Sequence, residues 1–304
     1  MIELVVTGCA GYVGSLLCDI LTQNSDYHIT GIDKFIHNNQ FAIHNLLARP
    51  NFNFVHSDIL SAPITLFKDK VVIHLAAIVG ASLCDKDVNE CYNSNVLSTI
   101  RVVDLSKRVI FLNTNSGYGK GSEDKCTEES PLLPVSLYGQ TKVQAEQYVL
   151  TNSNNVSLRL ATVFGASPRP RMDLMVNDFV AKMMFDKEFI IFEPNFRRNF
   201  VHIKDVCAAV IWSLNPNING IFNVGLDSAN TTKIGLAEQI KNIVRSNTNI
   251  IIGEGKDPDQ RDYIVSSDKI MNTGFKFKHS LEEGVKEIQC LCNIYGKKVK
   301  DFKN

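Results

Sequence analysis

The chain has 304 residues, and its 32 Lys and Arg residues balance its 32 Asp and Glu residues. That balance gives no indication of a nucleic-acid partner or of a membrane surface as partner, and the length suits one large domain or two closely joined ones. The sequence contains neither a secretory signal nor an apolar run long enough to span a bilayer. It therefore predicts a cytoplasmic protein with no membrane partner.

The eight cysteines include no C-x-x-C pair. Most stand among apolar neighbours, as Cys18 and Cys207 do, which is typical of reduced, buried thiols in a cytosolic protein. Cys290 and Cys292 lie close together in the sequence. Because they have no clustered His or Cys partners, we expect no metal site.

A glycine-rich junction follows the first predicted strand, which covers Ile2 to Val6. Gly8, Gly11 and Gly14 separate that strand from a predicted helix over Ser15 to Leu21. One glycine lets the chain turn sharply, one lets backbone N–H groups approach a pyrophosphate, and one lets the helix lie close to the sheet. The positive end of the helix dipole would then face the phosphates. The alternative is an ordinary tight turn between a strand and a helix.

The second predicted strand, His28 to Ile32, is followed by Asp33. A carboxylate at this point of a dinucleotide-binding unit accepts hydrogen bonds from the adenosine ribose. It also repels a 2′-phosphate, so the sequence predicts NAD rather than NADP as the cofactor.

A helix is expected over Asn38 to Leu47, and a third strand over Phe52 to His56 precedes Asp58. Asp58 is placed to accept a hydrogen bond from the adenine amino group, or it is a surface turn residue with no ligand.

A fourth strand, Val71 to Leu75, leads into Ala76 and Ala77. Their small side chains let a ligand lie against the backbone, which suits the second half of a dinucleotide. A helix over Asp87 to Lys107 and a fifth strand over Val109 to Leu112 come next. Apolar strands that alternate with amphipathic helices predict an α/β fold with a doubly wound parallel sheet.

Tyr138 and Lys142 stand four residues apart at the start of a helix expected to end near Thr151. This spacing puts them on one helix face. A nearby ammonium group favours the phenolate form of a tyrosine, and the positive charge of a nicotinamide adds to this effect. The pair is then suited to take a proton from a sugar hydroxyl. Without the glycine junction and Thr114, at the end of the fifth strand, a partly exposed helix pair would explain these residues equally well.

Together these motifs resemble the extended short-chain dehydrogenases/reductases that act on nucleotide sugars. The resemblance covers nearly the whole chain. It is carried by the glycine junction, Asp33, Tyr138 with Lys142, and the following further segments: Asp58-Ile59, His74 to Ala77, Asn95, Thr114 with Tyr118-Gly119, Arg159 to Gly165, Arg198 to His202 and Asp205-Val206.

The resemblance implies roles for individual residues. Tyr138 would be the catalytic base, Lys142 would lower its pKa and hold the nicotinamide ribose, and Thr114 would hydrogen-bond the reacting hydroxyl. NAD would be bound by residues of the strand ends and of the catalytic helix: Gly8, Gly11, Tyr12, Val13, Gly14, Asp33, Lys34, Asp58, Ile59, Leu75, Ala76, Ala77, Asn95, Tyr138 and Lys142.

The resemblance also implies a Rossmann-type NAD-binding domain over residues 1–165, to which residues 203–225 return. A smaller α/β C-terminal substrate lobe would comprise residues 166–202 and 226–304. A nucleoside-diphosphate sugar would be the substrate, and Arg198 and Arg261 match two arginines that contact the substrate diphosphate in similar epimerases. The expected substrate residues are Thr114, Asn115, Ser116, Arg169, Arg171, Arg198 and Arg261. For Arg169 and Arg171, solvated loop charge is the alternative.

Departures from the family pattern narrow the choice of reaction. The 4,6-dehydratases carry Asp-Glu after the catalytic Thr, where this chain has Asn115 and Ser116. The glutamate of decarboxylating relatives is also absent from this loop. Reductases that epimerise beside a ketone carry a cysteine there, and only Cys84, in the loop after the fourth strand, remains within reach.

What remains is oxidation of a sugar at C4 by hydride transfer to NAD. The sequence is compatible with a 4-epimerase and with a C4 dehydrogenase. The alternative that is not an enzyme is a catalytically silent binding protein that senses NAD. The resemblance further implies a homodimer formed through the helices near 87–107 and 138–151.

Overall fold

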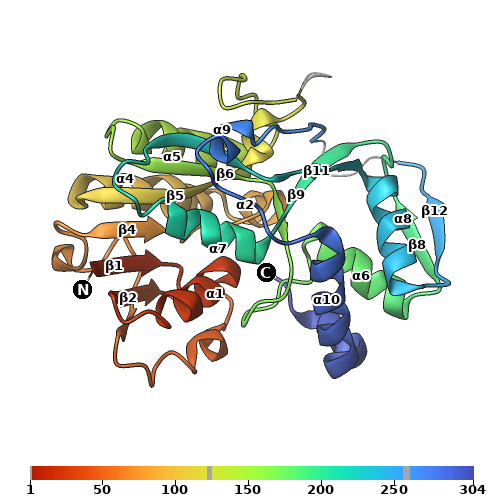
Figure 1. The fold of residues 1–304 in the computed structure, drawn as a ribbon, viewed down its shortest axis with the longest axis horizontal. Coiled ribbons are helices and arrows are strands. Elements are labelled where there is room, and N and C mark those ends of the chain that lie inside the picture. The colour runs from red at the N-terminus through yellow and green to blue at the C-terminus, as the bar shows by residue number, and fades with distance from the viewer. Residues whose placement is uncertain (1, 122–124, 256–260) are drawn as a thin grey trace.

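The computed structural model of the protein describes residues 2–121, 125–255 and 261–304. Its largest element is a seven-stranded sheet with the order β10-β6-β5-β4-β1-β2-β3, in which each neighbouring pair is parallel (Figure 1). The strands are β1 (Ile2–Thr7), β2 (Tyr27–Asp33), β3 (Phe52–His56), β4 (Val71–His74), β5 (Arg108–Thr114), β6 (Val156–Leu160) and β10 (Gly220–Val224). This strand order is that of a doubly wound Rossmann sheet, so the predicted fold class is confirmed.

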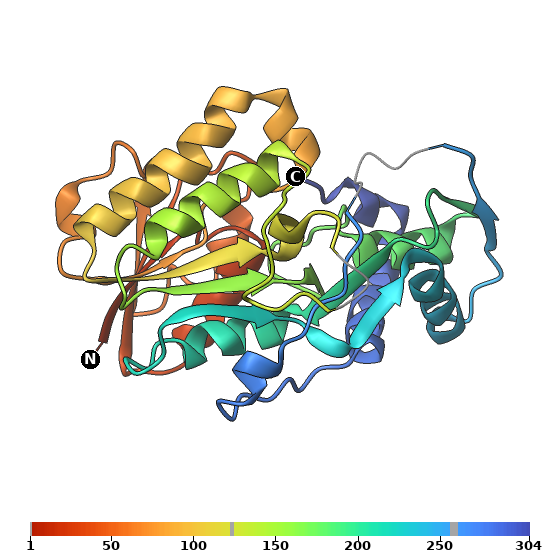
Figure 2. The same ribbon diagram turned by 90° about the horizontal axis from the view of Figure 1, so that it is seen from above.

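Helices cover both faces of this sheet (Figure 2). On one face α1 (Tyr12–Leu21) packs beside α7 (Ile203–Trp212), and on the other α4 (Ser98–Leu105) packs beside α5 (Leu137–Val149). Strands that are covered on both faces are apolar throughout rather than alternating. The central residues of β5, Val109 to Leu112, are accordingly apolar and buried.

The helix expected over Asn38 to Leu47 is not formed. Only a 3-10 turn, Gln40–Ile43, occurs there, followed by further turns. Asn38 adopts a left-handed conformation (φ 51°). Asn39, at the N-cap position, donates its side-chain amide to the carbonyl oxygen of Ala10 (2.6 Å) instead of capping a helix. The segment is therefore fastened to the glycine junction instead of starting a helix.

The single helix expected over Asp87 to Lys107 is also interrupted. The chain forms α2 (Ala81–Lys86), α3 (Val88–Tyr92), a π-helical turn over Asn93–Leu97 and then α4. Asp87 is extended (φ −143°) and its carboxylate accepts the Glu90 N–H, so it ends α2 and caps α3. Side-chain hydrogen bonds of Asn95 stabilise the π turn, a feature often found at functional sites.

The prediction that all cysteines are reduced is wrong for one pair. Cys84 in α2 and Cys91 in α3 form a disulfide, and the other six cysteines are free. The extended Asp87 folds α3 back against α2, which brings the two Cα atoms to 5.0 Å. The spacing of seven residues gave no sequence signal for this pairing, because it matches no common motif.

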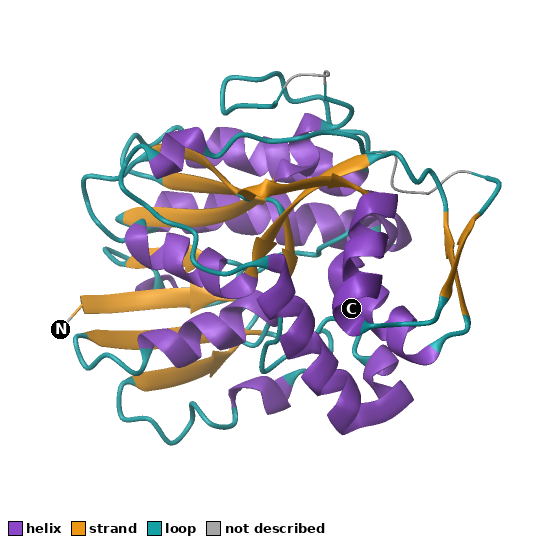
Figure 3. Ribbon diagram, turned by 45° about the vertical axis from the view of Figure 1, so that its right-hand side comes forward, coloured by secondary structure: helices purple, strands orange, loops and turns teal. Residues whose placement is uncertain are grey.

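Beyond the main sheet the chain builds a second group of helices and strands. A three-stranded sheet of order β11-β9-β7 and a separate ribbon of β12 and β8 belong to it, and the ribbon lies on the far side from the N-terminus (Figure 3). The strands are β7 (Thr162–Phe164), β8 (Glu188–Ile191), β9 (Arg197–His202), β11 (Leu226–Thr232) and β12 (Asn249–Ile252). The helices are α6 (Met175–Phe185), α8 (Lys233–Val244) and α10 (Leu281–Tyr295). The short α9 (Asp268–Met271) instead packs against β10 of the main sheet, and its Ile270 is part of that sheet's apolar core.

This second group has an apolar core of its own, to which α6, α8 and α10 contribute. Residues 203–224 return to the first group as α7 and β10. The domain boundaries at 165, 203 and 225 stay a prediction. Within the described residues, no helix has both the length and the apolar character that crossing a membrane requires.

Candidate active site

A cavity of about 1020 Å³ opens at the carboxyl edge of the main sheet. The residues that follow β1, β2, β3, β4, β5 and β6 line it, together with residues of α6, β8 and the C-terminal Lys303 and Asn304. This edge, where the strand order reverses between β1 and β4, is where ligands bind in doubly wound sheets.

The glycine junction shapes one wall of the cavity. Gly8 has a positive φ of 70°, and a Cβ there would come within 2.8 Å of the Ala76 nitrogen. A Cβ on Gly14 would overlap the carbonyl oxygen of Gly8. Gly11, at the N-cap of α1, offers no side chain to the free N–H groups, and the first turn has no acidic residue. The junction therefore leaves backbone donors and the positive helix end open to an anion, which fits a dinucleotide pyrophosphate.

Asp33 ends β2 with its carboxylate held from both sides. One oxygen accepts the Ala10 N–H (3.0 Å) and the other the Phe35 N–H (2.8 Å). Burial raises the pKa of this carboxyl, although the two N–H groups and Arg169 oppose the shift. The side chain lines the cavity in a fixed position, as a ribose ligand requires.

We expect Asp33→Asn to lower the preference for NAD over NADP at least tenfold, because the amide keeps the shape but not the charge that repels a 2′-phosphate. Dissociation constants for both cofactors, measured by fluorescence or calorimetry, give the ratio. Asp26→Asn, on the exposed turn before β2, is the matched control for the change in charge. An unchanged ratio in Asp33→Asn would contradict the ribose assignment.

Lys34 and Asp58 form an ionic cluster at the same end of the cavity. The Lys34 Nζ bonds Asp58 (2.7 Å) and also Glu90 of α3 (2.5 Å). Burial alone would raise the pKa of Asp58, but Lys34 and the Leu60 N–H lower it below its usual range. A charged Asp58 is thus available beside Ile59, which also lines the cavity.

The end of β4 forms the next part of the wall. The Thr7 hydroxyl accepts the N–H groups of Leu75 (3.2 Å) and Ala76 (3.3 Å) and bonds the ring of His74 (2.7 Å). These bonds hold the chain against the glycine junction. Leu75 lines the cavity here, and Ala76 and Ala77 line it with little bulk.

Thr114, Tyr138 and Lys142 all line this cavity. Thr114 ends β5, and its hydroxyl lies 2.9 Å from that of Ser116. Tyr138 and Lys142 lie one turn apart on α5, which Ser136 caps by accepting the Gly139 N–H. The Lys142 Nζ is buried 3.8 Å from the centre of the Phe111 ring. The structure therefore brings the three predicted catalytic side chains together.

Burial shifts the pKa values of Lys142 and Tyr138. It lowers the pKa of Lys142 to about 7, although Glu146 opposes the shift. It also raises the pKa of Tyr138, against the influence of Arg261, Arg171 and the Thr114 hydroxyl. In the protein by itself Tyr138 is thus a neutral phenol, so the phenolate expected from the sequence depends on the positive charge of a bound nicotinamide.

Lys142 makes stability depend on pH. Its folded pKa of about 7 lies below the usual lysine value, so between these values the unfolded chain holds more protons and stability rises with pH. We expect the free energy of unfolding of the cofactor-free protein to gain about 1 kcal/mol per pH unit from this group. Urea denaturation at pH 7, 8 and 9 should show a smaller rise for Lys142→Met than for the wild type. An equal rise in both would contradict the shift, and the exposed Lys107→Met is the control.

The two arginines expected to bind the diphosphate differ in position. Arg261 lines the cavity and donates a hydrogen bond to the Ser116 hydroxyl. Arg198 is fully buried and does not line the cavity; its Nη1 donates to the backbone carbonyls of Arg197 and Arg261. Arg198 therefore supports the chain that carries Arg261.

Arg169 and Arg171 are not solvated loop charges, because they are only 5% and 8% exposed and both line the cavity. Arg171 pairs with Asp173. Burial lowers the pKa of Arg169 to about 10, with Asp33 among the opposing charges. Together with burial, both arginines lower the pKa of His37 to about 4. Arg169 thus lies on the cofactor side of the cavity, beside Asp33 and His37.

Of the other predicted residues, Asn95 and Asn115 are buried and do not line the cavity. Sequence reasoning missed lining residues of the second group, such as Lys182, Phe189 and Lys233. They belong to no motif, and no signal in the sequence points to them. Among the described residues, no cluster of three His, Cys, Asp or Glu side chains is arranged to hold a metal ion.

The geometry agrees with comparisons to known proteins. The model of the NAD dependent epimerase/dehydratase family matches residues 4–225. The chain belongs to this family. Membership confirms the resemblance seen in the sequence: the protein is an enzyme of the NAD dependent epimerase/dehydratase family, and NAD is its cofactor.

Members of the NAD dependent epimerase/dehydratase family that are similar to this chain differ in activity. A putative UDP-glucose 4-epimerase of Methanocaldococcus jannaschii is 28% identical over 302 residues, which cover 94% of this chain and 96% of the relative. UDP-glucuronic acid decarboxylase 6 of Arabidopsis thaliana is 24% identical over 300 residues, which cover 93% and 86%. The crystal structure of UDP-glucuronic acid 4-epimerase from Bacillus cereus, in complex with UDP-glucuronic acid and NAD, is 26% identical with a TM-score of 0.86, covering 97% of this chain and 100% of that chain.

Proposed function

We propose that the protein is a nucleotide-sugar 4-epimerase, which oxidises a nucleoside-diphosphate sugar at C4 and reduces the ketone on its other face. The observation that carries the proposal is the meeting of Thr114, Tyr138 and Lys142 in one cavity with the glycine junction and Asp33. When bound, NAD would accept the hydride from C4 and return it.

The residues of the protein would handle the proton and the substrate. Tyr138 takes the proton of the C4 hydroxyl through its phenolic oxygen and returns it to the epimer. Thr114 orients that hydroxyl, and its bond to Ser116 fixes its own direction. Lys142, one turn further along α5, would hold the nicotinamide ribose.

The surroundings of Thr114 argue against elimination of water or carbon dioxide. Asn115 and Ser116 carry an amide and a hydroxyl, so neither supplies a carboxylic acid. Asn115 is also fully buried away from the cavity, and Ser116 is bonded to Thr114 and Arg261. The described carboxylates that line the cavity already have partners. Asp33 binds backbone N–H groups, and the three others pair with a cation: Asp58 with Lys34, Asp173 with Arg171 and Asp178 with Lys182.

The substrate would be a UDP-sugar. The names of the relatives reported above all include one, and the cavity holds cations suited to a diphosphate, with Arg261 nearest to the catalytic hydroxyls. A guanidinium group binds phosphate oxygens in a bidentate way. Arg169, beside Asp33, is better placed for the cofactor than for the sugar nucleotide.

A C4 dehydrogenase is the second candidate, since it needs the same residues and differs only in releasing the ketosugar. The presence of both Tyr138 and Lys142 in the cavity argues against a catalytically silent NAD sensor. Cys84 is bonded to Cys91 and does not line the cavity, so it offers no acid or base for epimerisation beside a ketone.

A panel of UDP-, GDP-, CDP- and dTDP-sugars tests the proposal. The reaction is followed by absorbance near 340 nm while the products are separated. An isomeric product without net NADH would support an epimerase. Accumulating NADH with a ketosugar would make the protein a dehydrogenase, and loss of carbon dioxide or water would overturn the C4 epimerase proposal. Silence across the panel would favour the sensor.

We also propose a division of labour between the two parts of the chain, a homodimer and a cytoplasmic location. The Rossmann domain would hold the cofactor, and the substrate lobe predicted over residues 166–202 and 226–304 would hold the sugar nucleotide. Leu97 on the π turn, an apolar side chain that is 38% exposed, supports a homodimer through this turn, α4 and α5. Comparing the sedimentation of the wild type with that of Leu97→Glu tests the dimer. The location is proposed as cytoplasmic.

A further inference from the structure

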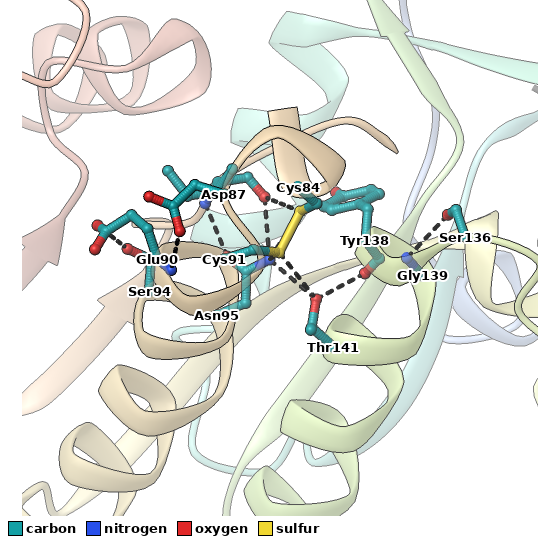
Figure 4. The surroundings of a disulfide bond; sticks show 11 residues. Cys84, Asp87, Glu90, Cys91, Ser94, Asn95, Ser136, Tyr138, Gly139 and Thr141 are labelled. Carbon is teal, nitrogen blue, oxygen red and sulfur yellow. Dashed lines mark hydrogen bonds between the residues drawn. A yellow bond between two sulfur atoms is a disulfide. The ribbon is translucent and has the colours of Figure 1, made fainter. Parts of the chain in front are cut away.

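The disulfide between Cys84 and Cys91 lies beside the catalytic tyrosine (Figure 4). Both cysteines are fully buried, and with Ile78 they form a small apolar cluster against which Tyr138 and Leu137 pack. The chain that joins the two cysteines is exposed from Asp85 to Asn89. The bond thus fastens a surface segment onto the active site.

We propose that the Cys84–Cys91 pair is a redox modification site that controls how long NAD stays bound. In the disulfide form, α3 holds α2 in the wall of the cavity and the cofactor leaves slowly. In the dithiol form, this segment opens and the cofactor exchanges faster. The inference depends on NAD as the cofactor and not on which reaction the enzyme performs.

Contacts on the catalytic side connect the disulfide to the cavity wall. The Asn95 amide donates to the Ile78 carbonyl (3.0 Å) and to the Thr141 hydroxyl (3.1 Å), and its nitrogen lies 3.4 Å from the Cys91 sulfur. Thr141 in turn donates to the Tyr138 carbonyl (3.0 Å). Residues Ile78 to Leu83, between β4 and the first cysteine, line the cavity. Movement of α2 and α3 therefore changes a wall of the cofactor site.

Contacts on the adenosine side connect the same segment to the other end of the cavity. Glu90, next to Cys91 in α3, bonds Lys34 (2.5 Å) and Ser94 (2.9 Å). Lys34 and Ser94 both line the cavity. Because Glu90 of α3 bonds two lining residues at this end and Cys91 of α3 contacts Asn95 on the catalytic side, fixing α3 to α2 would hold both ends at once. Preorganising a site in this way lowers the cost of binding.

The structure of α2 and α3 favours local opening. The two helices have only six and five residues, and an extended Asp87 separates them. Helices this short have little stability of their own, and such elements open in local fluctuations that expose buried groups. A thiol reductant then reaches the sulfurs, although neither is exposed in the closed form.

The chemistry is thiol–disulfide exchange. The thiolate of a dithiol reductant attacks one sulfur, which breaks the Cys84–Cys91 bond and forms a mixed disulfide. The second thiol of the reductant closes its own disulfide and releases the remaining cysteine. Two electrons and two protons pass from the reductant to the protein, and a small-molecule disulfide reverses the step.

The test compares the release of NADH from the whole protein in its two redox states. Wild-type protein is treated with oxidised glutathione or with dithiothreitol, and alkylation with mass spectrometry assigns the state of Cys84 and Cys91. Bound NADH is displaced by excess NAD, and its fluorescence gives the release rate. We expect release to be about tenfold faster after reduction, since affinity changes within one site mostly alter dissociation.

Two variants serve as controls. Cys84→Ser/Cys91→Ser should release NADH at the fast rate whether or not dithiothreitol is added. Cys290→Ser, at an exposed free cysteine, should behave like the wild type. If the double variant fails to fold, the comparison of NADH release from oxidised and reduced wild-type protein still tests the proposal.

Three outcomes would overturn the proposal. The first is that Cys84 and Cys91 can still be alkylated after oxidation. The second is that NADH is released equally fast from the oxidised and the reduced wild type. The third is that dithiothreitol still changes the NADH release rate of the double variant. None of these results bears on epimerase activity, which the sugar panel tests separately.

Discussion

Tyr138→Phe is expected to lower kcat about 1000-fold, because a positioned acid–base group contributes about 10²- to 10⁴-fold to a proton transfer. The change removes only the phenolic oxygen that faces Thr114 in the cavity. Steady-state kinetics on the best substrate of the panel gives the loss. Binding of NADH, measured by fluorescence, should stay within a factor of about two, since the ring and its packing remain.

Tyr148→Phe is the matched control for this change. Tyr148 lies on the same helix as Tyr138, but its hydroxyl bonds Asp104 outside the cavity (2.7 Å). We expect its loss to leave kcat unchanged. A Tyr138→Phe enzyme with wild-type turnover would contradict the assignment of the proton acceptor.

Arg159→Met is expected to produce the largest loss of stability. Arg159 in β6 makes three hydrogen bonds to Glu146 in α5, at 2.6, 3.0 and 3.1 Å, and the two side chains are only 4% and 2% exposed. Removing one partner of such a pair leaves a buried charge without compensation, which costs about 3–5 kcal/mol. Urea denaturation measures the loss in the free energy of unfolding.

Two further variants separate the buried charge from simple packing. Arg159→Met/Glu146→Leu should regain most of the stability, because replacing both charges of a buried pair by apolar groups is often nearly neutral. Lys286→Ala removes an exposed helix pair with Glu282 and should cost about 0.5 kcal/mol or less. A double variant as unstable as Arg159→Met would show that the arginine stabilises the fold by its shape and not by its charge.

The sequence was sufficient for the features that depend on local pattern. Buried parallel strands must be apolar along their length, so β1, β4 and β5 were visible as short apolar runs. The turn between β1 and α1 needs glycine at Gly8 and Gly14 for steric reasons, and the ribose carboxylate, Asp33, must stand at the end of β2. These residues stand near each other in the sequence, so their spacing carries the information.

The features that were missed depend on contacts between distant segments. Arg198 and Arg261 are equivalent as sequence signals, but the first lies beneath the backbone of the second. The π turn arises because Asn95 bonds Ile78 and Thr141, which lie 17 and 46 residues away. Lys233, at the start of α8, reaches the cavity only through the packing of the second group. No local pattern specifies such tertiary contacts.

The fate of hydrogen at C4 tests the central claim most directly. The UDP-sugar that turns over in the panel is prepared with deuterium at C4 and incubated in ordinary water with catalytic amounts of the enzyme. Mass spectrometry and NMR of the separated products locate the label. An epimer that keeps deuterium at C4, with no NADH released, is the result that the account predicts. An epimer that has lost the label to water, or a deuterated NADH in solution beside a ketosugar, would contradict it.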